Sequence, residues 1–388
     1  MTLPAWAPSD TGEWGTAVRE LIAAAGSPHV DVLGAHLATL PDNLTKRREI
    51  KKAWSRATVA LLGPGVDGFV LDAVAAFAEA GGISQPMAGT QNRDLAIAFV
   101  AAAGAGRIAG AAPVLLRLAR RAASIPGTGR MTRDDGIAAA AFYALADLDS
   151  PEGLDALCEL RRDLDYVILN ERVTEVLRQA AEALGVAEDD WLERAIPAWG
   201  LGPDAVGTIG PSGEGTIYGN APYRAEIAVV DFRTVTLTWR DDDGLVATTR
   251  HPFPSPTGFK RRFGSHHTES TQRAAKRVLA ELAAERRRLS RLSPTKSWKY
   301  DEWSRLYLSH PITGTVARAA IWEFTDADGR LVPAVPSTEG EFAALTAPPV
   351  EPVAVRLWNG AGTGTDERER WRKYLAGAGI ETALGQLG

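Results

Sequence analysis

The residues best suited to chemistry lie in the second half of the chain, where basic side chains gather. Between positions 250 and 299, thirteen Lys and Arg residues stand against three Glu residues, in a chain whose formal net charge is −5. Clustered basic side chains bind polyanions because binding releases the condensed counterions of the polyanion. The sequence therefore predicts an anion-binding surface, with nucleic acid as a candidate partner, made of Lys260, Arg261, Arg262, Arg273, Lys276, Arg277, Arg286, Arg287, Arg288 and Arg291. The alternative is a face that is solvated, or paired with acidic residues elsewhere in the chain.

A group of aromatic residues follows the basic segment and ends at a His-Pro step. Trp298, Trp303 and Tyr307 precede His310, and Pro311 must break the helix that carries them. Aromatic rings beside a broken helix are able to line a ligand pocket, and histidine is the usual general base. Two alternatives stay open. One is that the rings fill the core, and the other is that the His310 ring hydrogen-bonds the backbone of its own turn.

Other catalytic patterns are missing from the sequence. It contains no nucleophile elbow, no His-Glu-x-x-His and no zinc-ligand spacing. The adjacent His266 and His267 cannot both face one site on a helix, and Cys158 is the single cysteine. The aspartates at 241–243 precede a glycine, as in a hairpin turn. We therefore predict no metal site and no cofactor.

The composition is that of a soluble globular protein, with 45% hydrophobic and 23% charged residues. A chain of 388 residues is long enough for two or three domains. It has no run of about 18 uncharged apolar residues, and its first residues lack the basic start and apolar stretch of a signal peptide. These observations predict a cytoplasmic protein with no membrane span.

The elements before residue 195 are predicted to be helices. Ala and Leu recur there at helical spacing, and Gly and Pro residues separate the runs. Two helix pairs look alike: their starts, Arg93 and Arg133, are 40 residues apart, within the period of HEAT-type repeats of about 40–47 residues. The sequence favours stacked pairs, with an irregular bundle as the alternative. At least ten helices are expected before residue 200.

The remaining chain is predicted to be a smaller mixed domain. Residues 196–224 are rich in Gly and Pro and are expected to form a linker. Alternating patterns predict strands between about 225 and 360, one long helix over 268–292, and a helix capped by Ser297. The fold class is therefore mainly α: a HEAT-like helical array over 1–195, the linker over 196–224, and an α+β domain with antiparallel hairpins over 225–388.

Several motifs together resemble one bacterial family, the molybdate metabolism regulator-like proteins. This family is defined by a domain of unknown function that is sometimes fused to a WGR domain. The resemblance covers roughly residues 165 to 380 and is carried by the segment 196–201, Gln272 and Arg277, Trp298, Trp303, Tyr307, His310 and Pro311, Ile321 and Trp322, the segment 355–358, and Trp371, Arg372, Leu375, Gly379 and Ile380. It implies helices followed by a mixed α+β domain, and no agreed activity.

The sequence departs from this family in two places. Asn359 and Gly360 stand where members usually have His-Pro, and the usual C-terminal part of the family is missing after residue 380. We therefore expect a reduced or shortened member, in which any activity that needs the missing part is lost.

Two functions from different classes are compatible with these patterns. The first is a non-enzymatic binding or regulatory module, in which the helical array serves a protein partner and the basic surface serves an anionic partner. The second is an enzyme, or half of one, with a pocket near Trp298, Trp303 and His310. The sequence favours the binding module.

Overall fold

The computed structural model describes residues 3–10, 12–45, 50–79, 89–123, 132–164, 166–211, 221–337, 341–360 and 364–387. The chain divides into two compact units, Met1–Pro197 and Ala198–Gly388.

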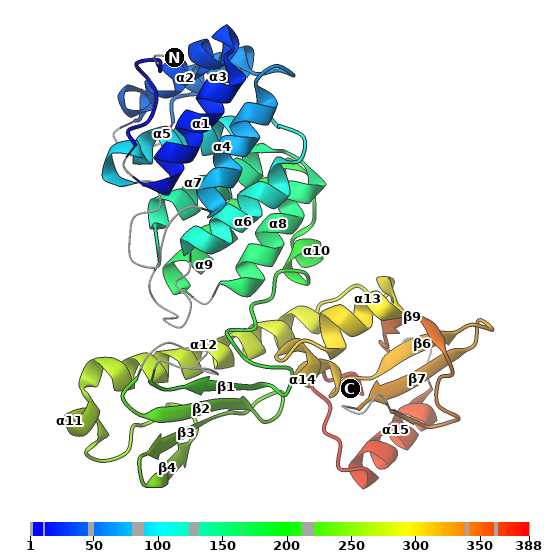
Figure 1. The fold of residues 1–388 in the computed structure, drawn as a ribbon. Helices are drawn as coiled ribbons and strands as arrows, with labels where there is room; N and C mark the ends of the chain where they lie inside the picture. The colour runs from blue at the N-terminus through cyan, green and yellow to red at the C-terminus, as the bar shows by residue number, and fades with distance from the viewer. Residues whose placement is uncertain are drawn as a thin grey trace. The chain divides into compact units, whose positions relative to one another are not determined.

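The described part of the first unit is built from helices (Figure 1). They are α1 (Glu13–Ala25), α2 (Pro28–Leu37), the 3₁₀-helix η1 (Leu40–Asn43), α3 (Lys52–Leu61), α4 (Asp67–Glu79), α5 (Gly89–Ala105), α6 (Ala111–Ala123), α7 (Asp135–Asp147), α8 (Pro151–Asp163), α9 (Val167–Ala183) and α10 (Glu188–Leu192). Among these residues, β pairing is limited to one bridge between Leu44 and Ile50. The predictions of a helical region and of at least ten helices before residue 200 are confirmed.

The later helices of this unit stack in two rows. Helices α4, α6 and α8 pack in sequence against one another, and so do α5, α7 and α9. The predicted helix pairs correspond to α5 with α6 and α7 with α8. Small residues allow the close approach: a Cβ atom added to Gly104 would lie 2.5 Å from backbone atoms of Ala144 on the neighbouring helix. The rows enclose a continuous core that also buries Cys158.

Ion pairs join one helix pair to the next at a regular sequence distance. Three arginines each reach an aspartate about forty residues later. The pairs are Arg93 with Asp134 at 2.7 Å, Arg107 with Asp149 at 2.7 Å, and Arg120 with Asp163 at 2.5 Å. Asp134 also accepts hydrogen bonds from the backbone N–H groups of Gly136 and Ile137, and thereby caps α7. The nearly constant offset indicates that corresponding positions of the two helix pairs lie side by side.

The second unit begins with a four-stranded antiparallel sheet of order β1-β2-β3-β4. Its strands are β1 (Val206–Ile209), β2 (Arg224–Val229), β3 (Val235–Asp241) and β4 (Gly244–Thr249), and the helices α11 (Phe259–Phe263) and α12 (Ser265–Leu289) follow. Helix α12 packs along β2 and β3 (Figure 1). The acidic turn between β3 and β4 is the predicted hairpin.

The predicted linker over 196–224 is wrong in part. Val206–Ile209 form β1, which pairs in register with β2, and Trp199, Leu201 and Ala205 are buried in the core of the unit. The physical reason is that every second residue of β1 is buried, a strand pattern that the surrounding glycines hide.

A second antiparallel sheet has the order β5-β9-β6-β7-β8. Its elements are β5 (Ser297–Lys299), α13 (Tyr300–Trp303), the π-helix η2 (Ser304–Leu308), α14 (Thr313–Ala317), β6 (Trp322–Asp326), β7 (Leu331–Pro336), β8 (Phe342–Ala344), β9 (Pro352–Leu357) and α15 (Thr365–Gly377). The prediction that Ser297 caps a helix is wrong, because Ser297–Lys299 pair with β9 as a strand. The chain as a whole is mainly α, with a smaller α+β part.

Candidate functional site

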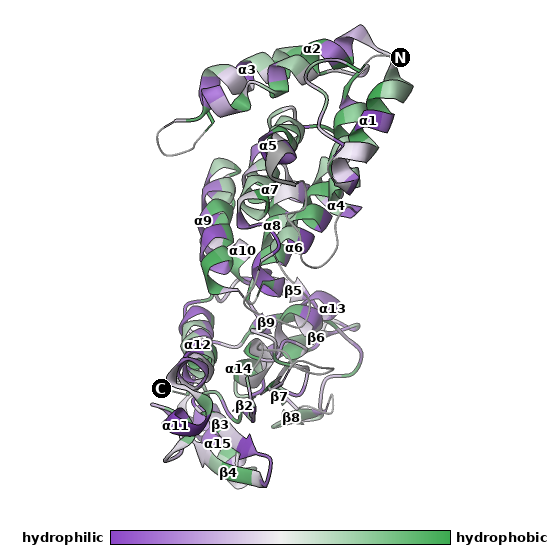
Figure 2. Cartoon of the chain, turned by 60° about the vertical axis from the view of Figure 1, so that its left-hand side comes forward, coloured by the Kyte–Doolittle hydropathy of each residue, from purple (hydrophilic) through white to green (hydrophobic). Residues whose placement is uncertain are grey.

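The helix α12 presents the predicted basic surface. Its inner side is buried and carries Ala274, Ala275, Val278, Leu282 and Leu289. Arg273, Lys276 and Arg287 are exposed at spacings that place them on the opposite side of the helix, and the exposed Arg291 directly follows it. At 1.5 Å per residue, Arg273 and Arg287 lie about 21 Å apart along the helix axis. Figure 2 shows hydrophilic residues along α11 and α12.

Some of the predicted basic residues are already engaged by other side chains. Lys260 forms an ion pair with Glu269 at 3.4 Å, and Arg262 forms one with Asp241 at 3.1 Å. The guanidinium of Arg277 stacks over the ring of Trp199, 4.6 Å from its centroid. The two ion pairs are exposed and contribute little, so salt or a stronger anion can compete with them.

Of the ten basic residues predicted for this surface, six have no carboxylate partner in the described part of the chain. Five of them are exposed and Arg286 is half-buried. The six are Arg261, Arg273, Lys276, Arg286, Arg287 and Arg291. Their mutual repulsion is unfavourable wherever no anion stands between them. This group, which we call the open basic set, is the candidate anion-binding surface.

Arg288 does not belong to this surface, which corrects the sequence-based prediction. Its side chain is 4% exposed and forms two hydrogen bonds to the Glu285 carboxylate, at 2.8 and 3.1 Å. The guanidinium also donates to the Tyr307 hydroxyl at 3.4 Å. Burial works against its charge, yet the Glu285 carboxylate and the Tyr307 oxygen together raise the pKa of Arg288 above the usual arginine value. Arg288 therefore remains a cation inside the protein and ties α12 to η2.

The Glu285 carboxylate is satisfied by two elements. Besides Arg288, it accepts a hydrogen bond from the Thr313 hydroxyl at 3.0 Å, at the start of α14. A buried carboxylate needs such partners, because an isolated buried charge is very costly. The cluster of Glu285, Arg288, Tyr307 and Thr313 thus fastens α12, η2 and α14 to one another.

Three of the four predicted pocket residues lie in the core. Trp298 is 5% exposed, and Trp303 and Tyr307 are fully buried. Their rings surround Trp322, with centroid distances of 6.1, 5.2 and 5.5 Å respectively. The alternative that these rings fill the core is therefore the one the structure supports, and the equally buried Trp322 packs among them.

His310 has a structural partner in its own turn. Its Nδ1 atom accepts hydrogen bonds from the backbone N–H groups of Ile312 at 3.3 Å and Thr313 at 3.2 Å. The ring therefore satisfies the first amides of α14, as the alternative interpretation of the sequence expected. An Nδ1 atom that accepts two hydrogen bonds is not available as a general base.

The π-helix η2 and its contact with Gly314 could not be expected from the sequence. A Cβ atom on Gly314 would lie 2.5 Å from the carbonyl oxygen of Leu308, which accepts a hydrogen bond from Arg318 at 3.0 Å. Burial lowers the pKa of Arg318. Glycine at 314 thus permits α14 to pack closely on the end of η2. Insertions of this kind are frequent at functional sites.

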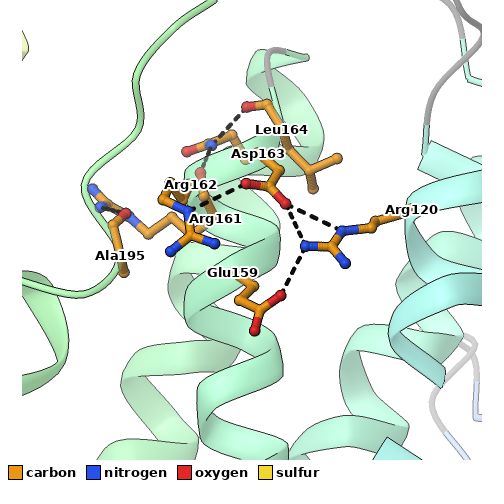
Figure 3. A network of polar contacts seen from close by, with 8 residues as sticks. Arg120, Glu159, Arg161, Arg162, Asp163, Leu164 and Ala195 are labelled. Atoms are coloured by element: carbon orange, nitrogen blue, oxygen red, sulfur yellow. Dashed lines mark hydrogen bonds and ion pairs between the residues drawn. The ribbon is translucent and has the colours of Figure 1, made fainter. Parts of the chain in front are cut away.

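The first unit contains a polar network of another kind. Figure 3 shows Arg120 of α6 between Glu159 and Asp163 of α8. Asp163 also accepts from Arg162 at 3.3 Å. All four side chains are between a third and a half exposed, so their contribution is small. The network joins α6 to α8, and its arginines, unlike those of the open basic set, each have a carboxylate partner.

The described residues contain neither a metal-binding cluster nor a membrane-spanning helix. In that part of the chain, no group of three or more His, Cys, Asp or Glu residues is arranged to hold a metal ion. No helix described by the structure is both long enough and apolar enough to cross a membrane.

Comparisons with known proteins give one match. The model of a domain of unknown function (DUF4132) matches residues 256–388, less than half of the chain. This range includes α11, α12 and the whole second sheet. No curated protein and no solved structure matches the chain.

Proposed function

We propose that this protein is a non-enzymatic binding module whose second unit binds an anionic partner, nucleic acid being the partner that the chemistry favours. The observation that carries the proposal is the open basic set on α11 and α12. Its members are spread along more than 20 Å of surface, about 21 Å separating Arg273 from Arg287 on α12 alone. A linear polyanion satisfies charges spread in this way, whereas a small anion reaches only one or two of them.

The helical array is proposed as a HEAT-like scaffold for a protein partner. The repeated ion pairs and the two rows of helices support this assignment. Tyr143 on α7 and Ile168 on α9 are 52% and 56% exposed, on helices that pack side by side. A cytoplasmic location is part of the same proposal.

The enzyme alternative has less support. The rings of Trp303 and Tyr307 fill a core, and the Nδ1 atom of His310 is occupied by backbone amides. These contacts support the binding module over the enzyme alternative.

The test is a fluorescence-anisotropy titration of labelled single-stranded and double-stranded nucleic acid with the whole chain. We expect binding at low salt that becomes micromolar or weaker at physiological salt and falls steeply as salt rises. Absence of binding by the parent protein at low salt would remove nucleic acid as the partner. Mass spectrometry of co-purified material tests the protein partner separately.

A further inference from the structure

The exposed side of helix α12 carries one stripe of residues that recur at intervals of three and four positions. Residues three and four apart are neighbours on one side of a helix, so the stripe follows the helix axis. Four of its members are exposed and Ala283 is half-buried. The stripe consists of Arg273, Lys276, Ala280, Ala283 and Arg287.

The positive charges along this stripe fall into two pairs, one near the middle of α12 and one at its end. The first pair begins one turn after Glu269, whose carboxylate is engaged by Lys260 at 3.4 Å. None of the four basic side chains has a carboxylate partner among the residues that the structure describes. The first pair is Arg273 with Lys276, and the second is Arg287 with Arg291, which directly follows the helix.

Between the two pairs the stripe is neutral. Ala280 and Ala283 fill this gap, and about 16–17 Å of helix axis separate Lys276 from Arg287. An alanine side chain has neither a charge nor a hydrogen-bonding group. The stripe therefore attracts anionic groups at its two ends and offers them nothing at its centre.

Two rows of phosphates that flank a groove match this pattern. The major groove of B-form DNA is about 12 Å wide and admits an α-helix, and an A-form RNA duplex has a wide, shallow minor groove. A helix that lies across such a groove reaches one phosphate row with each end, because the flexible side chains of Lys276 and Arg287 adjust the span. The alanines then lie over the groove, where small side chains allow close approach.

A single strand matches the stripe less well. Its phosphates follow one another every few ångströms, so a strand along the stripe places several of them over Ala280 and Ala283. No cation neutralises those phosphates, and they therefore release no counterions. A single strand that contacts both basic pairs leaves its middle phosphates without a partner on the stripe.

We propose that α12 binds double-stranded nucleic acid, lying across one groove with a basic pair on each phosphate row. This inference rests on the proposed function, because it names the kind of nucleic acid that the open basic set recognises. Alanine presents no donor or acceptor to a base edge, so binding should depend little on base sequence.

The test compares four nucleic acids of equal length and mixed sequence in fluorescence-anisotropy titrations of the whole chain. They are single-stranded DNA, duplex DNA, single-stranded RNA and duplex RNA. The parent should bind at least one duplex about tenfold or more tighter than the corresponding single strand at the same salt. The duplex that binds more tightly identifies the groove that α12 crosses.

A charge-relocation variant tests the spacing of the two pairs at constant net charge. It combines Ala280→Arg and Ala283→Arg with Arg287→Ala and Arg291→Ala, so that all four charges become contiguous. It should lose about tenfold or more in duplex affinity, because the contacts to the second phosphate row are lost, and should keep its affinity for single strands. The matched control, Arg287→Lys with Arg291→Lys, keeps the charges in place and should bind duplexes nearly as the parent does.

The outcomes separate this inference from the function on which it rests. Equal affinities of the parent for duplexes and single strands would overturn the inference and leave the proposed function standing. The same holds for a relocation variant that is folded by circular dichroism and binds duplexes as tightly as the parent. If that variant does not fold, the duplex preference of the parent still decides. Absence of binding to all four nucleic acids at low salt would overturn both.

Discussion

The two units of this protein use their arginines in opposite ways. In the helical array, Arg93, Arg107 and Arg120 each form an ion pair with an aspartate of the next helix pair. In the second unit, Arg273, Arg287 and Arg291 on and after α12 have no carboxylate partner in the described part of the chain. These three arginines of the array make internal contacts, whereas these three on and after α12 are exposed to solvent.

This difference in pairing separates arginines that stabilise the fold from arginines that an anionic partner is able to reach. Adjacent residues show it most clearly, since Arg288 is buried against Glu285 while Arg287 is exposed. Net charge alone cannot distinguish the two uses. The pairing state of each side chain does, and it can be tested residue by residue.

The largest expected effect is the difference in unfolding free energy between substitutions at Arg288 and at Arg287. Replacing Arg288 by Ala leaves the Glu285 carboxylate buried without its cation, which should lower the free energy of unfolding by about 3–5 kcal/mol. Replacing Arg287 by Ala should change it by no more than about 0.5 kcal/mol. Urea unfolding followed by tryptophan fluorescence measures both.

A double variant provides the control for this pair. Glu285→Leu combined with Arg288→Met removes both charges together and should be far closer to the parent than Arg288→Ala, because no isolated charge remains. Equal unfolding midpoints for the Arg287 and Arg288 variants would contradict the assigned roles.

The next effect concerns the close packing of α5 against α7 at Gly104. Gly104→Ala would bring a Cβ atom to 2.5 Å from the backbone of Ala144, and overpacking of this kind costs about 1–3 kcal/mol. Gly68→Ala on α4 is the matched control, because a Cβ there meets no atom within 4 Å and alanine is the better helix former. A thermal melt in which both variants equal the parent would show that α5 and α7 are less closely packed than described.

A smaller effect separates two arginines within the array. Arg93→Ala removes the cation that pairs with Asp134, whose side chain is only 4% exposed. This substitution should lower the free energy of unfolding by about 1–3 kcal/mol. Arg120→Ala removes a half-exposed pair and should cost less than about 1 kcal/mol. Chemical denaturation of both variants decides the order, and a larger loss for Arg120 would reverse our ranking of the two contacts.

Sequence patterns predicted the elements whose residues repeat at a helical or strand period. The Ala and Leu spacing predicted the paired helices, and runs of alternating or apolar residues predicted β2, β3, β4, β6, β7 and β9 but not the three-residue β8. Strand β1 was missed because its four residues lie among glycines, and β5 was missed because Ser297 also suits a helix cap. In both cases pairing with a distant strand decided the local structure.

The sequence predicted the candidate anion-binding site as a basic segment, but not which of its arginines are exposed. The sequence located the basic segment, but the consecutive residues Arg286, Arg287 and Arg288 looked equivalent in it. Helix rotation turns Arg288 toward Tyr307, and Glu285 toward Thr313, and those partners come from segments about 20 to 30 positions later. Contacts at such distances leave no periodic signal in the sequence.

The most direct test of the central claim compares two variants of equal charge. One replaces Arg273, Lys276, Arg287 and Arg291 by Gln, and the other replaces the exposed Lys52, Arg56, Arg117 and Arg172 of the helical array by Gln. We predict that the first variant loses nucleic-acid affinity and that its slope of log K against log salt flattens by up to about four, one for each lost phosphate contact. The second variant should bind with nearly the parent affinity and slope. Equal losses in the two variants would contradict the claim, because they would mean that net charge, rather than the open basic set, governs binding.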